Sequence, residues 1–247
     1  MAQLLPGKRI FVTGASRGLG RAFCACFAAH GADVAFNFAS DSDGAAETMR
    51  LVRQHGVRAL SFQVSVLDDA GLCRTALELE NAWGGVDILV NNAGVSQPLP
   101  LALMEEADWD KVLDINAKGQ FLATRAFIRG MIRRRSGAIL NLGSLAGVRL
   151  LEAPIHYSAS KAAVKGFSEA LCKEVARYNI RVNCLAPGLL EEGLAANLPD
   201  YRLKEYLKHV SLHRTGTLQE VAACAAFLIS DRNSYMNGAT IVMDGGL

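Results

Sequence analysis

The sequence lacks the features that mark membrane, secreted and nucleic-acid-binding proteins. None of its apolar runs approaches the ~18 residues that a membrane-spanning helix needs. Residues 1–8 are too few and too polar for a signal peptide. With 26 Lys and Arg against 24 Asp and Glu, charge favours neither nucleic acid nor an anionic membrane as a partner. Only 6 prolines accompany 23 glycines, which show no collagen-like period, so we expect a globular protein.

Cysteine is present without the patterns that bind metal. No two of the six cysteines form a Cys-x-x-Cys pair, and no histidine lies at zinc-ligand spacing from a cysteine pair. Most lie inside apolar segments; they are Cys24, Cys26, Cys73, Cys172, Cys184 and Cys224. This pattern favours small buried thiols in a reducing cytoplasm and no metal site.

Short β-rich runs alternate with segments of helical length along the whole chain. The runs span residues 9–13, 33–37, 59–64, 88–90, 138–142, 181–185 and 240–243. Repeated strand–helix–strand units imply right-handed crossovers between parallel strands. The sequence therefore predicts one α/β domain over residues 1–247, with a doubly wound, Rossmann-type parallel sheet of about seven strands and helices on both faces.

Three long segments stand out within this alternation. Helices are expected at 108–135 and 157–178, and both are unusually long. Residues 189–211 have no strand pattern and follow a strand end. An active-site lid would belong at that position, so we expect one there.

A glycine-rich loop follows the first expected strand and opens a helix. It reads Gly14-Ala15-Ser16-Arg17-Gly18-Leu19-Gly20. Glycines at these positions let the backbone turn tightly and approach a pyrophosphate, which a helix N-terminus then binds. The placement predicts a dinucleotide-binding site.

The chemistry-bearing residues come later in the chain. Asn91-Asn92-Ala93-Gly94 ends the fourth strand, where asparagine amides can tie neighbouring loops together. Tyr157 and Lys161 share one helix face, and a nearby ammonium lowers the pKa of a phenol. Ser144 follows a strand that ends at the same edge, and its hydroxyl and the phenol can both donate to a carbonyl oxygen. Asn116 lies in the preceding long helix.

Together these motifs resemble the short-chain dehydrogenase/reductase family, in order and spacing, over nearly the whole chain. The matching elements are Thr13-Gly14-x3-Gly18-x-Gly20, Asn91-Asn92-Ala93-Gly94, Asn116, Ser144, Tyr157-x3-Lys161 and Pro187-Gly188. Within the family, the glycine loop, Tyr157-Ser-Ala-Ser-Lys161 and the ending Met243-Asp244-Gly245-Gly246 are most similar to bacterial 3-oxoacyl-(acyl-carrier-protein) reductases.

The resemblance implies a role for each site residue. Tyr157 would be the general acid, Lys161 would lower its pKa and bind the nicotinamide ribose, and Ser144 would orient the substrate carbonyl. Asn116 would hold a water that links Lys161 to solvent. The expected cofactor contacts are Gly14, Ser16, Arg17, Gly18, Leu19, Gly20, Asn37, Ser65, Val66, Asn92, Ala93, Gly94, Tyr157, Lys161, Pro187, Gly188 and Leu190.

The end of the second strand favours NADP(H) over NAD(H). No acidic residue stands at its tip to bond a ribose 2′-OH, and Arg17 can pair with a 2′-phosphate. Asp41 and Asp43 come slightly later and keep NAD(H) possible.

Two positions depart from the family pattern. Ser65 stands where an aspartate usually bonds the adenine amino group, and a serine accepts a weaker hydrogen bond. Glu192 stands where a threonine usually holds the nicotinamide carboxamide, so either it contacts the cofactor poorly or it points away.

The resemblance predicts NADPH-dependent reduction of a 3-oxoacyl thioester, with an acyl carrier protein as a partner. The alternatives are a dehydrogenase of another small alcohol or ketone, and a weakly active subunit paired with an active homologue. Arg129, Arg133, Arg134 and Arg135 either offset a helix dipole or form a docking patch for the acidic carrier.

A homotetramer, or a hetero-oligomer with a homologue, is also expected. The two long helices carry apolar residues on more than one face, some of which would stay wet in a monomer. These residues are Phe121, Phe127, Ile128, Met131, Ile132, Val164, Phe167, Leu171 and Val175.

Overall fold

A computed structural model of the chain describes residues 3–149, 152–192 and 199–247. Seven strands form one parallel sheet in the order β3-β2-β1-β4-β5-β6-β7. The strands are β1 (Arg9–Val12), β2 (Asp33–Phe38), β3 (Ala59–Gln63), β4 (Ile88–Asn91), β5 (Gly137–Leu142), β6 (Ile180–Pro187) and β7 (Thr240–Met243). The predicted doubly wound sheet is confirmed.

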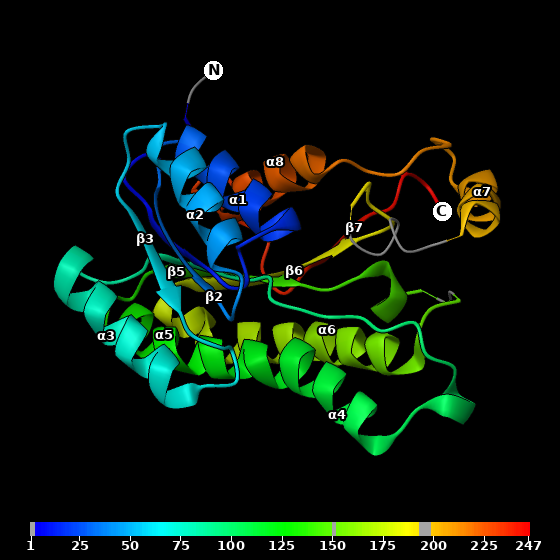
Figure 1. The fold of residues 1–247 in the computed structure, drawn as a ribbon. Coiled ribbons are helices and arrows are strands. Elements are labelled where there is room, and N and C mark those ends of the chain that lie inside the picture. Colours follow the sequence, from blue (N-terminus) through cyan, green and yellow to red (C-terminus); the bar gives the residue numbers. More distant parts are fainter. Residues whose placement is uncertain (1–2, 150–151, 193–198) are drawn as a thin grey trace.

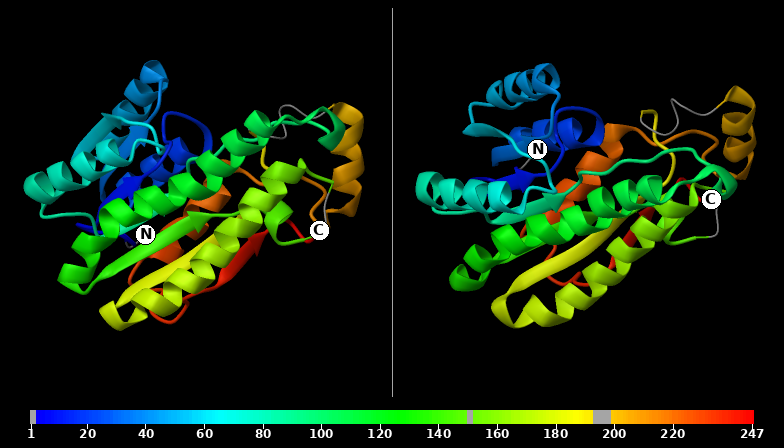
Figure 2. Two further views of the ribbon diagram at one scale, coloured as in Figure 1. Left: turned by 90° about the horizontal axis from the view of Figure 1, so that it is seen from below. Right: turned by 60° about the horizontal axis from the view of Figure 1, so that its bottom comes forward.

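Helices cover both faces of the sheet (Figure 1). They are α1 (Gly18–Ala29), α2 (Ser42–Arg53), α3 (Asp69–Trp83), α4 (Glu106–Leu113), α5 (Gly119–Arg134), α6 (Ile155–Val175), α7 (Asp200–His209) and α8 (Leu218–Ile229). Helices α1, α2 and α8 form one layer, and α3, α4, α5 and α6 form the other. Helix α7 stands apart at one end, and Figure 2 shows α5 and α6 lying side by side.

The central strands are apolar on both faces because both faces are covered. Strand β4 is buried along its whole length. On one side, Phe23 and Phe27 of α1 stack with ring centres 5.6 Å apart. On the other side, the ring centres of Phe11 of β1 and Phe127 of α5 are 4.5 Å apart. Two apolar layers therefore fix the sheet between its helices.

The strand order places a ligand site between β1 and β4. From β1 the chain moves outward through β2 and β3, and it then returns to start β4 on the other side of β1. In open α/β sheets, ligands bind beyond the carboxyl ends of strands at this reversal. The glycine loop follows β1 and the Asn92 loop follows β4, so both arrive there.

The first long helix differs from its prediction. The expected helix 108–135 is α4 followed by a π-helical turn, η2 (Asp114–Lys118), and then α5. Such a turn bulges the backbone and often occurs at functional sites. The second prediction is close: α6 ends at Val175, and one 3₁₀ turn, η4 (Ala176–Tyr178), completes it.

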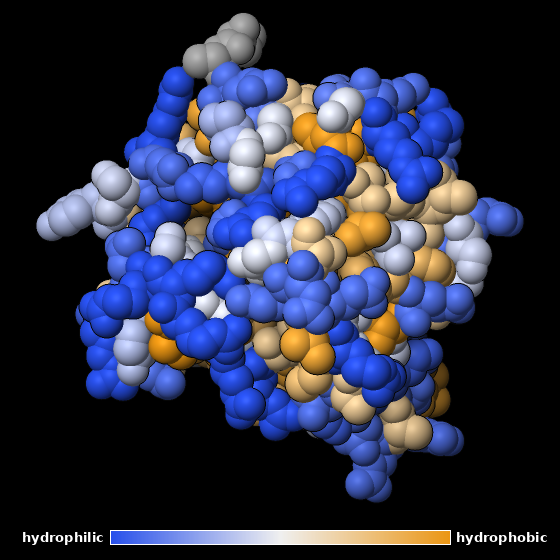
Figure 3. Space-filling model, turned by 90° about the vertical axis from the view of Figure 1, so that its left-hand side faces the viewer, coloured by the Kyte–Doolittle hydropathy of each residue, from blue (hydrophilic) through white to orange (hydrophobic). Residues whose placement is uncertain are grey.

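The apolar residues predicted on these two helices divide between the core and the surface. Phe127, Met131, Val164 and Val175 are buried within this chain, because they pack against the sheet and neighbouring helices. Phe121 is 45% exposed and remains a candidate for an interface. Hydrophilic residues predominate on the side where α2, α3 and β3 lie (Figure 3).

All six cysteines are free thiols, and two of them, Cys24 and Cys184, are fully buried in the sheet–helix layers. In the described part of the chain, no helix is both long and apolar enough to cross a bilayer. Part of the predicted lid, residues 193–198, lies outside the described residues.

Candidate active site

The glycine loop has the tight backbone that its sequence predicts. Gly14 and Gly18 have positive φ values of 66° and 53°. A Cβ on Gly14 would lie 2.8 Å from Ala93 Cα, and one on Gly20 would lie 2.5 Å from Gly14 O. Only glycine fits these two contacts. Above Gly18 the space is open, with nothing within 4 Å of an added Cβ.

The N-terminus of α1 is free to bind an anion. Arg17 is its N-cap residue and makes no side-chain cap bond, and no acidic residue lies in the first turn. The N–H groups of a first helical turn carry partial positive charge and lack intrahelical partners. Together with the open space at Gly18, they fit the pyrophosphate of a dinucleotide. Leu19 lies in this turn, and Ser16 O accepts from Arg21 at 2.5 Å.

Asn92 ties the loop after β4 to the glycine loop, as its position predicts. Its Nδ2 donates to Thr13 O at 2.9 Å and to Gly14 O at 3.0 Å. The Thr13 hydroxyl accepts in return from the backbone N–H groups of Asn92 and Ala93, at 2.9 and 3.0 Å. These bonds hold the two loops in one arrangement.

Asn37 supports the loop from within. It is 2% exposed; its Oδ1 accepts from Gly14 N at 3.1 Å, and its Nδ2 donates to Val64 O at 2.7 Å. Both ends of the amide are therefore used inside the protein. Asn37 therefore holds Gly14 in place, and a contact of Asn37 with the cofactor stays a prediction.

The acidic residue after β2 also has a structural use. Asp41 is the N-cap of α2 and accepts from Gly44 N at 2.9 Å. Asp43 lies exposed in the first turn of that helix, where a carboxylate complements the dipole. Arg17 is exposed, and no described residue forms an ion pair with it.

Ser65 and Val66 follow β3 with opposite exposures. Ser65 is exposed, and its hydroxyl accepts from Leu67 N at 3.2 Å in a turn. Val66 is buried, and its Cγ2 would lie 2.8 Å from a Cβ on Gly119. Ser65 thus presents the only side chain of the two that a ligand can reach.

Asn116 lies in the π-helical turn, and both ends of its side-chain amide form hydrogen bonds. Its Oδ1 accepts from Val95 N at 2.7 Å, and its Nδ2 donates to Val95 O and to Ser160 Oγ, both at 2.9 Å. Ser160 in turn donates to Tyr157 O at 2.7 Å. Ser160 was not predicted as a site residue; its place in Tyr157-Ser-Ala-Ser-Lys161 was the available signal.

Lys161 and Tyr157 lie together at the start of α6. The Lys161 Nζ is 5.7 Å from the centre of the Tyr157 ring and donates to Leu142 O at 2.7 Å. Gly94 fits closely beside them: a Cβ there would lie 3.5 Å from Lys161 Nζ and 3.2 Å from Asn116 Oδ1. The four predicted catalytic side chains therefore come from one region of the fold.

Burial controls the titration of both groups. It lowers the pKa of Lys161 to about 8, because the ammonium is removed from water. It also raises the pKa of Tyr157, which hydrogen bonding to the Ser144 hydroxyl only partly offsets. The expected lowering of the Tyr157 pKa is therefore not found in the chain alone, where the Lys161 ammonium bonds Leu142 O.

Ser144 stands where the sequence predicts, after β5. Its backbone is extended, with φ of −164°, and its hydroxyl accepts from Ala146 N at 3.2 Å. The following 3₁₀ turn, η3 (Leu145–Gly147), packs so closely on α6 that a Cβ on Gly147 would lie 2.4 Å from the Lys161 carbonyl carbon.

The segment after β6 is held by its backbone. Gly188 N donates to Met243 O at 2.8 Å, and Leu190 pairs with Gly216. The Glu191 carboxylate accepts from Leu218 N at 3.1 Å, at the start of α8. Glu192 is exposed, which agrees with the alternative in which it points away.

Some of the arginines at the end of α5 form contacts within the chain and are therefore not free to bind an acidic carrier. Arg134 donates to Glu80 at 3.0 Å and to Val86 O at 2.5 Å, and Arg135 donates to Arg177 O at 2.9 Å. Arg134 therefore belongs to the contact between α5 and α3, and docking by these arginines stays a prediction. Arg129 and Arg133 are exposed, although Arg133 also pairs with Glu80 at 3.2 Å.

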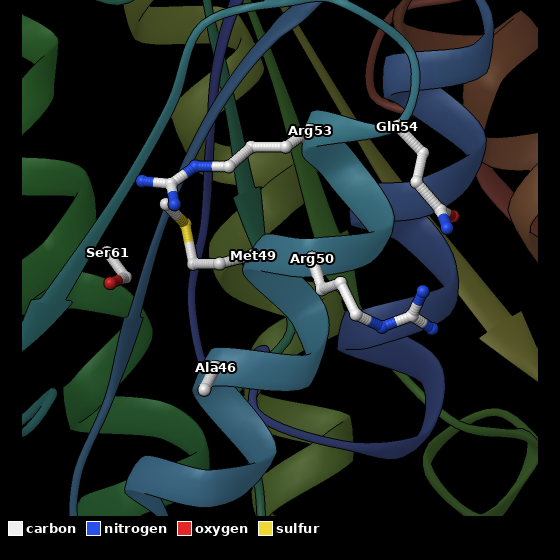
Figure 4. A pocket seen from close by; sticks show the side chains of 6 residues that line it. All are labelled: Ala46, Met49, Arg50, Arg53, Gln54 and Ser61. Carbon is white, nitrogen blue, oxygen red and sulfur yellow. The ribbon is translucent and has the colours of Figure 1, made fainter.

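A surface hollow lies away from this site, between α2 and the edge strand β3 (Figure 4). Met49 and Arg53 reach toward β3, while Arg50 points to the other side of the helix and pairs with Glu47 at 2.7 Å. No predicted site residue lines this hollow.

An open glycine loop at a doubly wound sheet, beside a tyrosine–lysine pair and a serine, defines a nucleotide-dependent oxidoreductase. The family model described as enoyl-(acyl carrier protein) reductase matches residues 14–247. The chain belongs to this family, within the short-chain dehydrogenases/reductases, and is an NAD(P)-dependent oxidoreductase.

Individual relatives match over nearly the full chain. The 3-oxoacyl-(acyl-carrier-protein) reductase of Chlamydia muridarum is 38% identical and covers 100% of both chains. The crystal structure of the reductase of that name from Brucella melitensis is 31% identical, with a TM-score of 0.92, over 100% of this chain and 93% of the other. NAD⁺-bound xylitol dehydrogenase is 28% identical, with a TM-score of 0.93, over 98% and 99%.

Proposed function

We propose that the chain reduces a 3-oxoacyl thioester to the 3-hydroxyacyl thioester, with NADPH as the cofactor. The observation that carries this proposal is the grouping of Ser144, Tyr157 and Lys161 at the sheet edge where the glycine loop opens α1. The names of the Chlamydia and Brucella relatives support the substrate class.

Two hydroxyl groups would bind the reacting carbonyl oxygen. The Ser144 hydroxyl lies near enough to Tyr157 to lower the pKa of the phenol, so both hydroxyls can donate to one oxygen as negative charge develops on it. Tyr157 would then transfer its proton to that oxygen. The raised pKa of the buried phenol keeps it protonated at neutral pH, as a proton donor must be.

Lys161 would supply the next proton. Its pKa of about 8 lies near neutral pH, so the side chain can release and regain a proton under working conditions. The Asn116 amide already binds Val95 and Ser160, and only the second lone pair of its Oδ1 is left for a water molecule. We therefore assign its side chain to holding the site together.

NADP(H) fits the residues of the glycine loop and the β2 tip better than NAD(H). The bound cofactor would supply the hydride. Gly18 and the first turn of α1 would hold its pyrophosphate, and Arg17 would pair with the 2′-phosphate. The Asp41 carboxylate already accepts from Gly44 N as the N-cap of α2, so it is less available to bond a ribose 2′-OH.

The test is a substrate and cofactor panel with the purified chain. We expect NADPH oxidation with a short 3-oxoacyl thioester, and slower oxidation of NADH. Oxidation of sugar alcohols with NAD⁺, and no reaction with the thioester, would overturn the proposal and favour a dehydrogenase like the xylitol enzyme. Arg17→Ala should weaken NADPH binding and leave NADH binding unchanged, whereas equal losses would reject the 2′-phosphate contact.

A further inference from the structure

Gln120 is a buried amide beside the candidate site that the proposed reaction does not use. The residue lies in the first turn of α5 and is 2% exposed. Its Nε2 donates to Leu142 O at 3.3 Å, and its Oε1 is buried with no hydrogen-bond partner in the described structure. Buried amides are normally fully paired, so a half-paired one next to a reactive group requires a reason.

The Leu142 carbonyl joins Gln120 to Lys161. This carbonyl, at the end of β5, also accepts from Lys161 Nζ at 2.7 Å. A carbonyl oxygen has two lone pairs, and here both are occupied by donors from two different helices. Because both nitrogens lie close to one oxygen, they are at most about 6 Å apart.

Gln120 and Asn116 reach toward the same helix. They are four residues apart, so they lie on one face of the segment formed by η2 and α5. Asn116 donates to Ser160 of α6, and Gln120 donates to the carbonyl that binds Lys161 of α6. One side chain thus fixes the helix, and the other reaches the lysine through a shared acceptor.

No anion balances the Lys161 ammonium in the described structure. The titratable groups that face it are Tyr157 of α6 and Cys184 of β6. Burial raises the pKa of both, so both are neutral at neutral pH. The dipoles around Leu142 O are therefore the main polar influence on the ammonium.

We propose that Gln120 is a positioning residue for Lys161, acting through Leu142 O. Its amide orients the Leu142 carbonyl and donates to the same oxygen as Lys161. The hydrogen bond from the ammonium to Leu142 O is therefore weaker than it would be without Gln120. The ammonium then directs its other two N–H groups toward the cofactor site. This inference rests on the proposed function, because it assigns Lys161 to the cofactor.

The test compares two variants by a readout that needs no activity. The pKa of Lys161 is measured by ¹³C NMR in cofactor-free protein with labelled lysine, and its signal is assigned by its loss in Lys161→Arg. Gln120→Met removes the donor at similar size, so the remaining Lys161 bond strengthens and the pKa rises. Gln120→Glu places a carboxylate within about 6 Å and should raise the pKa further.

NADPH binding provides the second readout. Gln120→Met should raise the dissociation constant of NADPH about threefold to tenfold, which corresponds to the net free energy of one hydrogen bond. The KM for the thioester at saturating NADPH should not change. Asn183→Leu is the matched control, because this buried amide binds Met236 O at 3.0 Å and not Leu142. It should lower stability and leave the Lys161 pKa unchanged.

The outcomes separate the two proposals. A Lys161 pKa and an NADPH dissociation constant that match wild type in Gln120→Met would overturn the role of Gln120. If that variant does not fold, an unchanged Lys161 pKa in Gln120→Glu has the same consequence. If both variants shift the Lys161 pKa but the wild-type chain does not reduce the thioester, only the proposed function is overturned.

Discussion

At the scale of single residues, the site depends on a lysine that is buried with no counter-ion among the described residues. The cost of removing its charge from water lowers the pKa of Lys161 to about 8. Burial thus gives Lys161 a pKa that suits proton transfer near neutral pH, the role that the proposed function assigns to it. Structural lysines such as Lys165, four residues later, instead pair with a carboxylate at 2.7 Å.

The buried lysine makes stability depend on pH. Between pH 8 and 10.5 the folded chain has lost the Lys161 proton while the unfolded chain retains it. The unfolded state then binds more protons, so the contribution of Lys161 to stability rises with pH, by about 3 kcal/mol in total. Urea unfolding of wild type and Lys161→Met should show this rise as a growing difference in favour of wild type. A Lys165→Met control should show none, and a flat Lys161→Met difference would mean that the ammonium is hydrated.

Removing the Tyr157 hydroxyl removes the proposed proton donor and changes little else. We expect Tyr157→Phe to lower turnover about 10²–10⁴-fold, the usual effect of losing a general acid. Circular dichroism and NADPH titration should match wild type. A folded variant that keeps more than roughly a tenth of the activity would assign the acid to another group.

Glu192 offers a test of the segment after β6. Its side chain is exposed, and the neighbouring Glu191 holds the segment to α8. Glu192→Thr should therefore leave the dissociation constant of NADPH unchanged. Tighter binding by about 0.5–1.5 kcal/mol would instead show that residue 192 contacts the cofactor, as in the family pattern.

At the scale of elements, the end of α5 combines two roles. Arg133 and Arg134 both pair with Glu80 of α3, and Arg129 and Arg133 are exposed. If the exposed pair docks an acidic carrier, Arg129→Glu with Arg133→Glu should raise the KM for a carrier-bound thioester, with strong salt dependence, and spare a small thioester. Arg134→Glu should destabilise the chain and affect both substrates. Equal losses on both substrates in the double variant would exclude docking here.

The elements also show what the sequence could predict. Glycine positions, the alternation of strands and helices, and the Tyr157–Lys161 spacing follow from local rules, and they predicted the sheet and the reactive side chains. The Leu142 carbonyl, the shared bond from Gln120 and the Arg134–Glu80 pair could not be predicted. The first is a backbone group, and the other two join residues that are 22 and 54 positions apart in the sequence. Only tertiary packing brings them together.

At the scale of the whole molecule, exposed apolar side chains predict an oligomer. Most of the apolar residues on α5 and α6 are used in the core, but Phe121 is 45% exposed and Ile155 is 47% exposed. Covering them would favour a tetramer built on these helices, as the resemblance implies. Light scattering should give about four chains, and Phe121→Asp should give fewer. A wild-type mass of one chain at micromolar concentration would contradict this expectation.

The transfer of a labelled hydride from NADPH tests whether the chain reduces a 3-oxoacyl thioester. The purified chain is given NADPH that carries deuterium on its reactive face, together with a 3-oxoacyl thioester, and the product is examined by mass spectrometry. We expect a 3-hydroxyacyl thioester with one deuterium on C3, formed by wild type and nearly absent with Tyr157→Phe. A product without deuterium, or no product with either nicotinamide cofactor, would contradict it.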